Sequence, residues 1–248
     1  MRSRTRLLTI FSLALLGAGL LAVPASATGS RHDRHDRHDR HHRTYEVTIY
    51  NTSLGQPLSP PVVATHRRGL TLFRVGRRAS DGIIAIAEDG NATPAAEALA
   101  GSRRVTDVEV LDPIAPLGTR TDVPTSRTVR VTARRGDRLS VAGMLICTND
   151  GFAGVDRMRL PRHGTRTVVL GTYDAGSERN TEASTDIVDP CSALGPVDLD
   201  GDPNGNVNDG IDTTARIARH PGVDGAVGDL RPAHDWELAG VLTVRRVR

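Results

Sequence analysis

RLSVAGMLIC at residues 138–147, followed by TNDGFAGVD at 148–156, is the stretch that decides the fold. Apolar and small polar residues alternate in its first half before the run becomes continuously apolar, which predicts a largely buried β-strand. The second half carries the Asp-Gly and Ala-Gly pairs of a turn, and DRMRLP at 156–161 resumes the alternation. The stretch therefore predicts two strands joined by a loop that contains aspartates.

The same two-residue period recurs along the rest of the chain. Alternation of apolar and polar residues over five to ten positions is typical of half-buried strands. Strands are predicted at residues 45–51, 61–66, 70–75, 128–133, 138–147, 156–161, 165–173 and 240–247. About eight strands joined by Gly-, Pro- and Asp-rich turns favour an all-β fold, an antiparallel β-sandwich in one domain at residues 44–248.

Two stretches between Ser80 and Gly101, SDGIIAIAED and TPAAEALAG, have helical spacing instead. Ser80 and Thr93 are their predicted N-caps, and Pro94 suits a first helical position. We expect both short helices to cover an end or an edge of the sandwich. From Val188 to Asp235 turn residues replace periodicity, which predicts a long loop near the C-terminus.

Residues 1–27 have the features of a signal peptide. Arg2, Arg4 and Arg6 precede an apolar stretch, and Ala25-Ser26-Ala27 supplies small residues for cleavage, so we expect a secreted chain that begins at Thr28. An uncleaved signal anchor is the alternative. No later segment is apolar enough to cross a membrane, so no transmembrane segment is expected after cleavage.

Residues 28–43 contain the repeat RHDRHDRHDRHHR at 31–43, which has no apolar side chain to bury. We interpret it as a disordered linker. Metal capture by its histidines and attachment to an anionic surface are the alternatives.

The basic residues exclude one class of partner. All 32 Lys+Arg residues are arginine, which indicates a bias of the coding genome, and the formal net charge is only +3. Because the basic residues are interleaved with acids and no basic stretch is rich in aromatics, nucleic acid is not an expected partner.

Cys147 and Cys191 are the only two cysteines. In an exported protein such a pair is most simply a disulfide, and two buried free thiols are the alternative.

Three aspartates form the first candidate metal site. If the strands at 156–161 and 165–173 form a hairpin, Asp156 and Asp174 lie at one end of the sandwich, where Asp150 arrives from the preceding loop. A cation would offset the repulsion among their carboxylates, and hard oxygen ligands suit Ca²⁺. Asp-Gly pairs are also common turn formers, so an ordinary polar turn is the alternative.

A second, weaker calcium loop is predicted in DLDGDPNGNVNDGID at 198–212. Asp200, Asp202, Asn204 and Gly205 match the first positions of an EF-hand loop. Ile211 stands where the bidentate carboxylate is required, so a flexible acidic turn is the favoured interpretation.

Several motifs in order along residues 44–247 resemble the bacterial members of the spondin-type domain family: YEVTIYN, PLSPPVVATH, IIAIAEDG, MLICTNDGFAGVDRMRLP, TYDAGSERNTE and RHPGVDGAVGDLRPAHDW. The resemblance implies a β-sandwich with one calcium ion held by loops at one end. Asp150, Asp156 and Asp174 match the family's aspartates by motif. Gly151 and Phe152 stand where animal members place a tryptophan, which puts a partner-contacting role of that loop in doubt.

The expected function is therefore non-catalytic adhesion or recognition in the extracellular matrix or at a cell surface, with an unidentified protein, glycan or lipid as the partner. The chain has no Gly-x-Ser-x-Gly or His-Glu-x-x-His motif. A secreted hydrolase that uses Asp150, Asp156 and Asp174 is the alternative.

Overall fold

The structure of the chain is a computed structural model that describes residues 42–117, 121–188, 191, 212–225, 228 and 230–247. The predicted signal peptide, the linker up to residue 41 and the loop with Asp200, Asp202 and Asn204 lie outside the described residues. The first strand begins at His42, two residues before the expected start of the domain.

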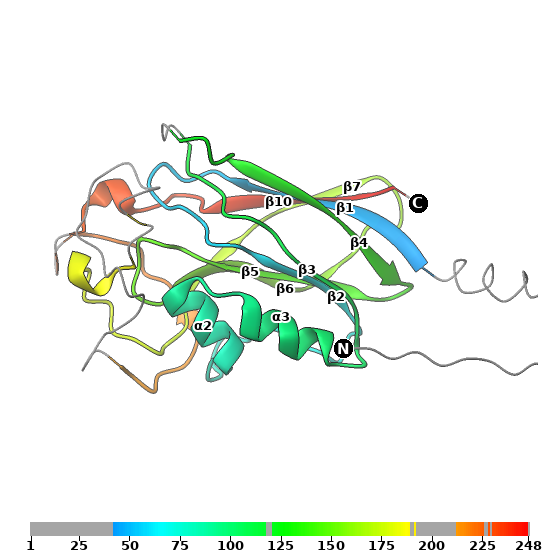
Figure 1. Cartoon of the computed structure of the whole chain (residues 1–248), viewed down its shortest axis with the longest axis horizontal. Coiled ribbons are helices and arrows are strands. Elements are labelled where there is room, and N and C mark those ends of the chain that lie inside the picture. The colour runs from blue at the N-terminus through cyan, green and yellow to red at the C-terminus, as the bar shows by residue number, and fades with distance from the viewer. Residues whose placement is uncertain are drawn as a thin grey trace, which may run out of the picture.

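Two antiparallel sheets stack face to face, as the alternation predicts (Figure 1). The four-stranded sheet has the order β4 (Ser126–Arg134), β1 (His42–Asn51), β10 (Gly240–Arg246), β7 (Thr165–Val169). The six-stranded sheet has the order β3 (Val105–Val110), β2 (Val62–His66), β5 (Arg138–Met144), β6 (Gly151–Arg159), β8 (Gly171–Asp174), β9 (Ala218–Arg219). Two 3₁₀ turns, η1 (Ser184–Asp186) and η2 (Pro232–His234), lie in the connections.

The main core lies between the sheets. Val47 and Ile49 of β1 face Leu139 and Val141 of β5 across it, and all four side chains are almost completely buried. Burial of each such side chain stabilises the fold by about 1.5–3 kcal/mol. The period-two pattern of these strands therefore reports which face of each sheet points inward.

A second core lies on the outer face of the six-stranded sheet, beneath α2 (Asp81–Asp89) and α3 (Thr93–Ala100) (Figure 1). Ile83 and Ile86 of α2 pack there with Val62 and Ala64 of β2. Because this sheet is covered on both faces, every residue of β2 is buried. The helices thus lie over the face of a sheet and not at an end of the sandwich.

The first helix begins as predicted, and the second does not. Ser80 caps α2, because its Oγ accepts a hydrogen bond from the backbone N–H of Ile83. The prediction of Thr93 as an N-cap is wrong, since α3 already includes Thr93 and follows Ala92. The side chain of Asn91 accepts the Thr93 N–H instead, at 3.0 Å.

Two strand predictions are wrong. Residues 165–173 form no single strand, because β7 joins the four-stranded sheet and β8 pairs with β6 in the six-stranded one. The buried residue Leu170 lies between β7 and β8, where the chain passes from one sheet to the other. Residues 70–75 form no strand, since Phe73 packs on the outer face of the sheet against Phe152, with ring centroids 5.0 Å apart.

The predicted disulfide is confirmed: Cys147, just after β5, is bonded to Cys191. It fastens the chain at Cys191 to the end of the sandwich, beside the buried side chains of Ile146 and Ile187. The bond closes a loop with a sequence separation of 44 residues.

Replacing both cysteines, Cys147→Ser with Cys191→Ser, is expected to lower the free energy of unfolding by about 4 kcal/mol, because the unfolded chain regains the entropy of the open loop. Urea denaturation of the oxidised wild type and the double variant measures the difference. Adding a reductant should lower the stability of the wild type and leave that of the double variant unchanged. A reductant effect on both proteins would contradict the assignment.

Candidate functional site

The loop from Leu145 to Asp150, between β5 and β6, is buried although half of its residues are polar. Buried polar side chains require hydrogen-bond partners. Thr148 finds them within the loop, as its Oγ donates to the carbonyl of Leu145 and accepts the N–H of Gly151. Asn149 finds them in the segment after β8, where its Oδ1 accepts the N–H of Thr181.

Asp150 is fully buried at the end of this loop. Its Oδ2 accepts hydrogen bonds from the backbone N–H groups of Ser177 and Glu178, at 2.8 and 3.0 Å. Its Oδ1 is buried and has no hydrogen-bond partner among the described residues. The carboxylate therefore holds the 175–178 turn on one side and presents one unused oxygen on the other.

Asp174 lies beside Asp150, because Gly151 of β6 pairs with Asp174 of β8. Its Oδ1 accepts the N–H of Gly176, and its Oδ2 accepts the side-chain amide of Asn180. Burial raises the pKa of Asp150 to about 6, and the charge of Asp174 adds to this rise. The two predicted aspartates are thus neighbours whose charges repel each other in a buried setting.

Asp150 and Asp174 define the carboxylate pole, and the backbone of a third acidic residue, Glu178, lies beside them. The sequence reasoning missed Glu178. Its side chain is only 2% exposed, and its backbone N–H binds the Asp150 carboxylate. The available signal was its spacing, four residues after Asp174 in YDAGSE, on a turn that the aspartate itself closes.

Asp156 lies away from these groups. It lies five positions along the extended strand from Gly151, a distance of about 16 Å. Its Oδ1 accepts hydrogen bonds from the backbone N–H of Leu72 and the hydroxyl of Ser140. The structure brings Asp150 and Asp174 together and gives Asp156 a place in the packing of the 70–75 segment.

His220 closes the pole from the C-terminal side. Burial lowers its pKa, while Asp174 and Asp235 oppose that effect. Its Nδ1 accepts the N–H of Gly222 at 3.1 Å, which assigns the proton of the neutral ring to Nε2. Gly151 is required here, because a Cβ at that position would lie 2.5 Å from Thr148 Oγ and 3.0 Å from the His220 ring.

A sequence model of one protein family, Spondin_N, matches residues 38–189, more than half of the chain. The chain belongs to the Spondin_N family. The match includes the loop with Asp150 and the turn with Asp174 and Glu178, and it confirms the family expected from the motifs. No curated protein matches the chain. No helix in the described part of this Spondin_N protein combines the length and apolar character that a membrane span requires.

Phe152 follows Gly151 in the loop whose partner-contacting role the sequence puts in doubt. Its ring is fully buried between Phe73 and Tyr173, with centroid distances of 5.0 and 5.3 Å. In this Spondin_N domain the residue belongs to the core beneath the 70–75 segment.

The carboxylate pole has the donor chemistry of a calcium site. Ca²⁺ takes carboxylate and backbone carbonyl oxygens. Asp150 Oδ1, beside Asp174, is the kind of buried anionic oxygen that a cation would satisfy. Asp150 and Asp174 are the carboxylates that could hold the ion, with Glu178 near them in the fold, although no three described acidic residues of this pole have oxygens all within 4.8 Å of one another.

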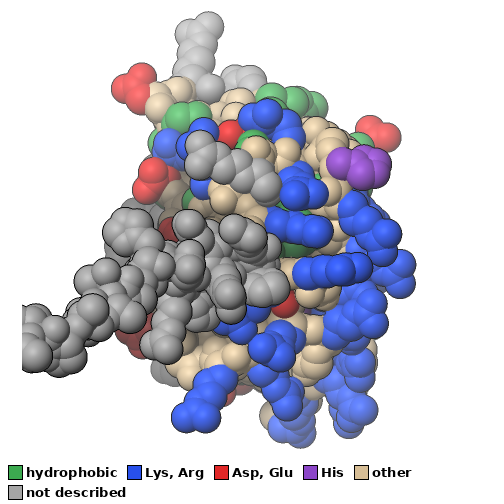
Figure 2. Space-filling view, turned by 90° about the vertical axis from the view of Figure 1, so that its right-hand side faces the viewer, with side chains coloured by type: hydrophobic (Ala, Val, Ile, Leu, Met, Phe, Trp, Pro, Cys, Tyr) green, Lys and Arg blue, Asp and Glu red, His purple; other side chains and the backbone are tan. Residues whose placement is uncertain are grey.

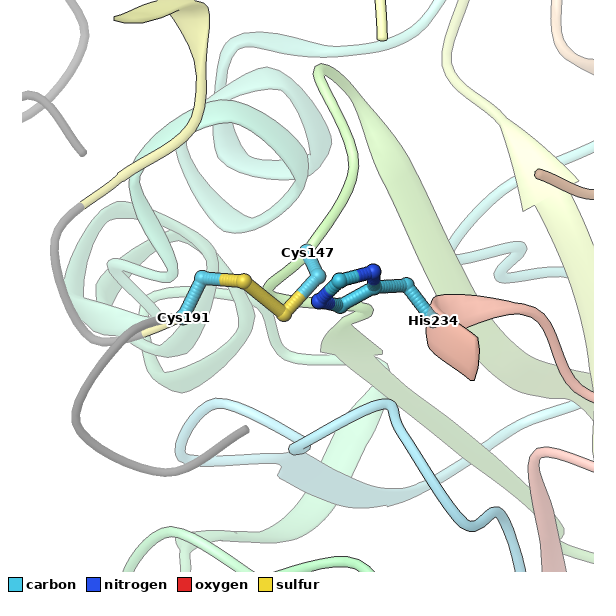
Figure 3. A group of neighbouring side chains, drawn as sticks. All are labelled: Cys147, Cys191 and His234. Carbon is cyan, nitrogen blue, oxygen red and sulfur yellow. A yellow bond between two sulfur atoms is a disulfide. The ribbon is translucent and has the colours of Figure 1, made fainter. Parts of the chain in front are cut away.

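One other group has metal-ligand residue types (Figure 3). Across the described ranges, the only three His, Cys, Asp or Glu residues with ligand atoms all within 4.8 Å of one another are Cys147, Cys191 and His234. The two sulfur atoms are bonded to each other, so neither is a thiolate ligand. The buried ring of His234 packs beside this disulfide, and burial lowers its pKa.

Asp150→Asn is expected to stabilise the cation-free Spondin_N domain at neutral pH. The pKa of Asp150 in the fold, about 6, exceeds its ordinary value of 3.8, so its stabilising contribution is fully present below pH 3.8 and is lost as the pH rises through 6. The ionised carboxylate then costs about 3 kcal/mol, which the uncharged amide avoids.

Urea denaturation in EGTA at pH 4 and pH 7.5 measures this effect, with a gain expected at pH 7.5 alone. Asp156→Asn, which keeps an acceptor oxygen for Leu72 and Ser140, is the matched control. An equal loss of stability at both pH values in Asp150→Asn would contradict the interpretation.

Proposed function

We propose that this Spondin_N protein is a secreted, non-catalytic recognition module whose carboxylate pole binds one structural Ca²⁺ ion. The observation that carries the metal site is the buried Oδ1 of Asp150, without a partner among the described residues and next to the charge of Asp174. A divalent cation would compensate both carboxylates at once.

The donor set favours calcium over a transition metal. Asp150, Asp174 and Glu178 provide oxygen atoms, whereas zinc and copper prefer imidazole and thiolate ligands. The one imidazole at the pole, that of His220, accepts the N–H of Gly222 with Nδ1 and carries its proton on Nε2, so it offers no free nitrogen to a metal. Ca²⁺ also accepts oxygen ligands in flexible geometry, which suits carboxylates that come from a loop and from a strand end.

The hydrogen bonds of the carboxylates support a structural role for the ion. Asp150 and Asp174 each bind backbone N–H groups of the segment that they hold, and Asp150 is completely buried. A catalytic metal site needs an open position for water or substrate. We infer that the ion fixes the 175–182 segment.

An extracellular location is supported by three independent features. The chain belongs to the Spondin_N family, it carries the Cys147–Cys191 disulfide, and residues 1–27 have the pattern of a signal peptide. Disulfides persist in oxidising compartments. Adhesion to a matrix or cell surface is the role that we propose for such a module.

Calcium is expected to raise the midpoint of thermal unfolding of the whole secreted chain. At a calcium concentration about 100-fold above Kd, binding contributes about 2.7 kcal/mol, which corresponds to a shift of about 5–10 °C for a domain of this size. Scanning calorimetry at pH 7.5 in EGTA and in excess Ca²⁺ measures the shift.

Three variants locate the ion. Asp174→Asn should lose most of the calcium-induced shift, whereas Asp156→Asn should keep it. The double variant Asp200→Asn with Asp202→Asn should also keep it, which separates the pole from the second predicted loop. Absence of a calcium response in the wild type, or its persistence in Asp174→Asn, would overturn the assignment.

A further inference from the structure

The antiparallel strands define a second pole at the opposite end of the sandwich. Arg138 at the start of β5 pairs with Arg159 at the end of β6, far along the strands from the Gly151–Asp174 pair. In the other sheet, Arg134 at the end of β4 pairs with His42 at the start of β1. Figure 2 faces this pole and shows arginine side chains gathered over its described surface, with scattered acidic ones.

A cavity of about 840 Å³ lies at this pole, and eight of its thirteen lining residues are arginines. The turn from β4 to β5 contributes Arg134, Arg135 and Arg138, and the connection from β6 to β7 contributes Arg159 and Arg162.

The remaining three arginines come from other segments. Arg43 lies in β1, Arg246 lies at the end of β10, and Arg68 follows β2. Arginines from five separate segments of the chain thus converge on one concave surface.

Little negative charge compensates this surface. Asp137 is the only carboxylate that lines the cavity, and its Oδ2 is bound by the hydroxyl of Thr106 and the N–H of Arg134. In the described ranges, Arg68, Arg135 and Arg162 form no ion pair, whereas Arg130 and Arg245 on the four-stranded sheet both pair with Glu46. Burial lowers the pKa of Arg138, and the neighbouring arginines lower it further.

The shape and lining of the cavity indicate the kind of partner. An anionic membrane attracts basic residues by charge alone, but a bilayer surface is flat and reaches only the rim of a cavity. The two apolar lining residues, Tyr45 and Leu160, are buried and half-buried and offer it little apolar contact. Single-stranded nucleic acid would call for exposed aromatic rings on which bases stack, and Tyr45 is only 3% exposed. A concave surface lined by eight arginines, of which Arg68, Arg135 and Arg162 form no ion pair in the described ranges, suits a flexible chain with regularly spaced carboxylate or sulfate groups, which Arg binds with paired N–H donors.

We propose that this arginine pole is a binding site for an acidic polysaccharide. The site names a ligand class for the recognition role proposed above and rests on that role, but it does not depend on the calcium ion, which would lie at the other pole.

The test compares two triple variants of the whole secreted chain that lose the same charge. Arg68→Gln, Arg135→Gln and Arg162→Gln remove exposed guanidinium groups of the cavity. Arg74→Gln, Arg77→Gln and Arg78→Gln remove exposed groups of the loop over the six-stranded sheet. Both triples should unfold at the wild-type temperature, because none of these side chains forms a described hydrogen bond.

Binding to heparin as the sulfated probe and to polygalacturonate as the carboxylated probe is measured by calorimetry in about 50 mM NaCl at pH 8. The cavity triple should bind the preferred probe about tenfold more weakly, since three charge contacts are lost, and the loop triple should change by less than about threefold. Wild-type binding should be the same in EGTA and in Ca²⁺.

Equal losses in both triples would mean diffuse attraction without a site and would overturn the proposal. Binding only to phosphatidylserine vesicles or to duplex DNA, or to none of the probes, would overturn it as well. A calcium-dependent unfolding temperature in a protein that binds neither polysaccharide would leave the metal site standing and remove the arginine pole. Polysaccharide binding without a calcium-dependent unfolding temperature would support the arginine pole and remove the metal site.

Discussion

The structure depends on how one buried polar loop is satisfied. Residues 145–150 turn from β5 to β6 inside the protein, where backbone and side-chain groups cannot reach water. Asn149 and Asp150 obtain their partners from the 177–181 segment, which in turn has its conformation set by those bonds. The disulfide fastens the next part of the chain to the same loop. Without this mutual hydrogen bonding, neither segment would have a defined place.

The cost of this arrangement is a carboxylate that the fold would prefer to keep protonated. Burial and Asp174 both act against the charge of Asp150, although Ser177 and Glu178 donate to it. A core built only for stability would carry an amide at such a position, since an uncompensated buried charge is costly. The retained charge is the physical argument for a cation, and it is independent of the Spondin_N match.

Most of the sheet pattern could be predicted from the sequence, because inward-facing residues such as Val47 and Ile49 alternate with polar ones. The helix start at Ser80 followed from local hydrogen-bonding chemistry. The change of sheet at Leu170 could not be predicted, since β7 and β8 have the same period and only tertiary pairing separates them. The predicted hairpin of residues 156–161 and 165–173 placed Asp156 beside Asp174, and that hairpin does not form.

The residues of the carboxylate pole and of the arginine pole show the same limit of prediction from sequence. Asp150 and Asp174 were found because each stands in an Asp-Gly or Asp-Ala-Gly turn, whereas Glu178 is an ordinary residue of the turn until its burial is known. The number of arginines carries no information about a binding site, because it follows from genomic composition. Their positions at strand ends do carry such information, but which strand ends lie together is known only from the register of the strands.

The pairing of β1 with β10 has a mechanical consequence. Tyr45 pairs with Arg246, so the first and last described strands are antiparallel neighbours whose outer ends lie side by side. Tension between these two ends would load the inter-strand hydrogen bonds one after another, since they run perpendicular to the strands. The strands would therefore separate one hydrogen bond at a time under weak force, whereas a pull on one end against the opposite end of the sandwich would have to shear whole strands at once.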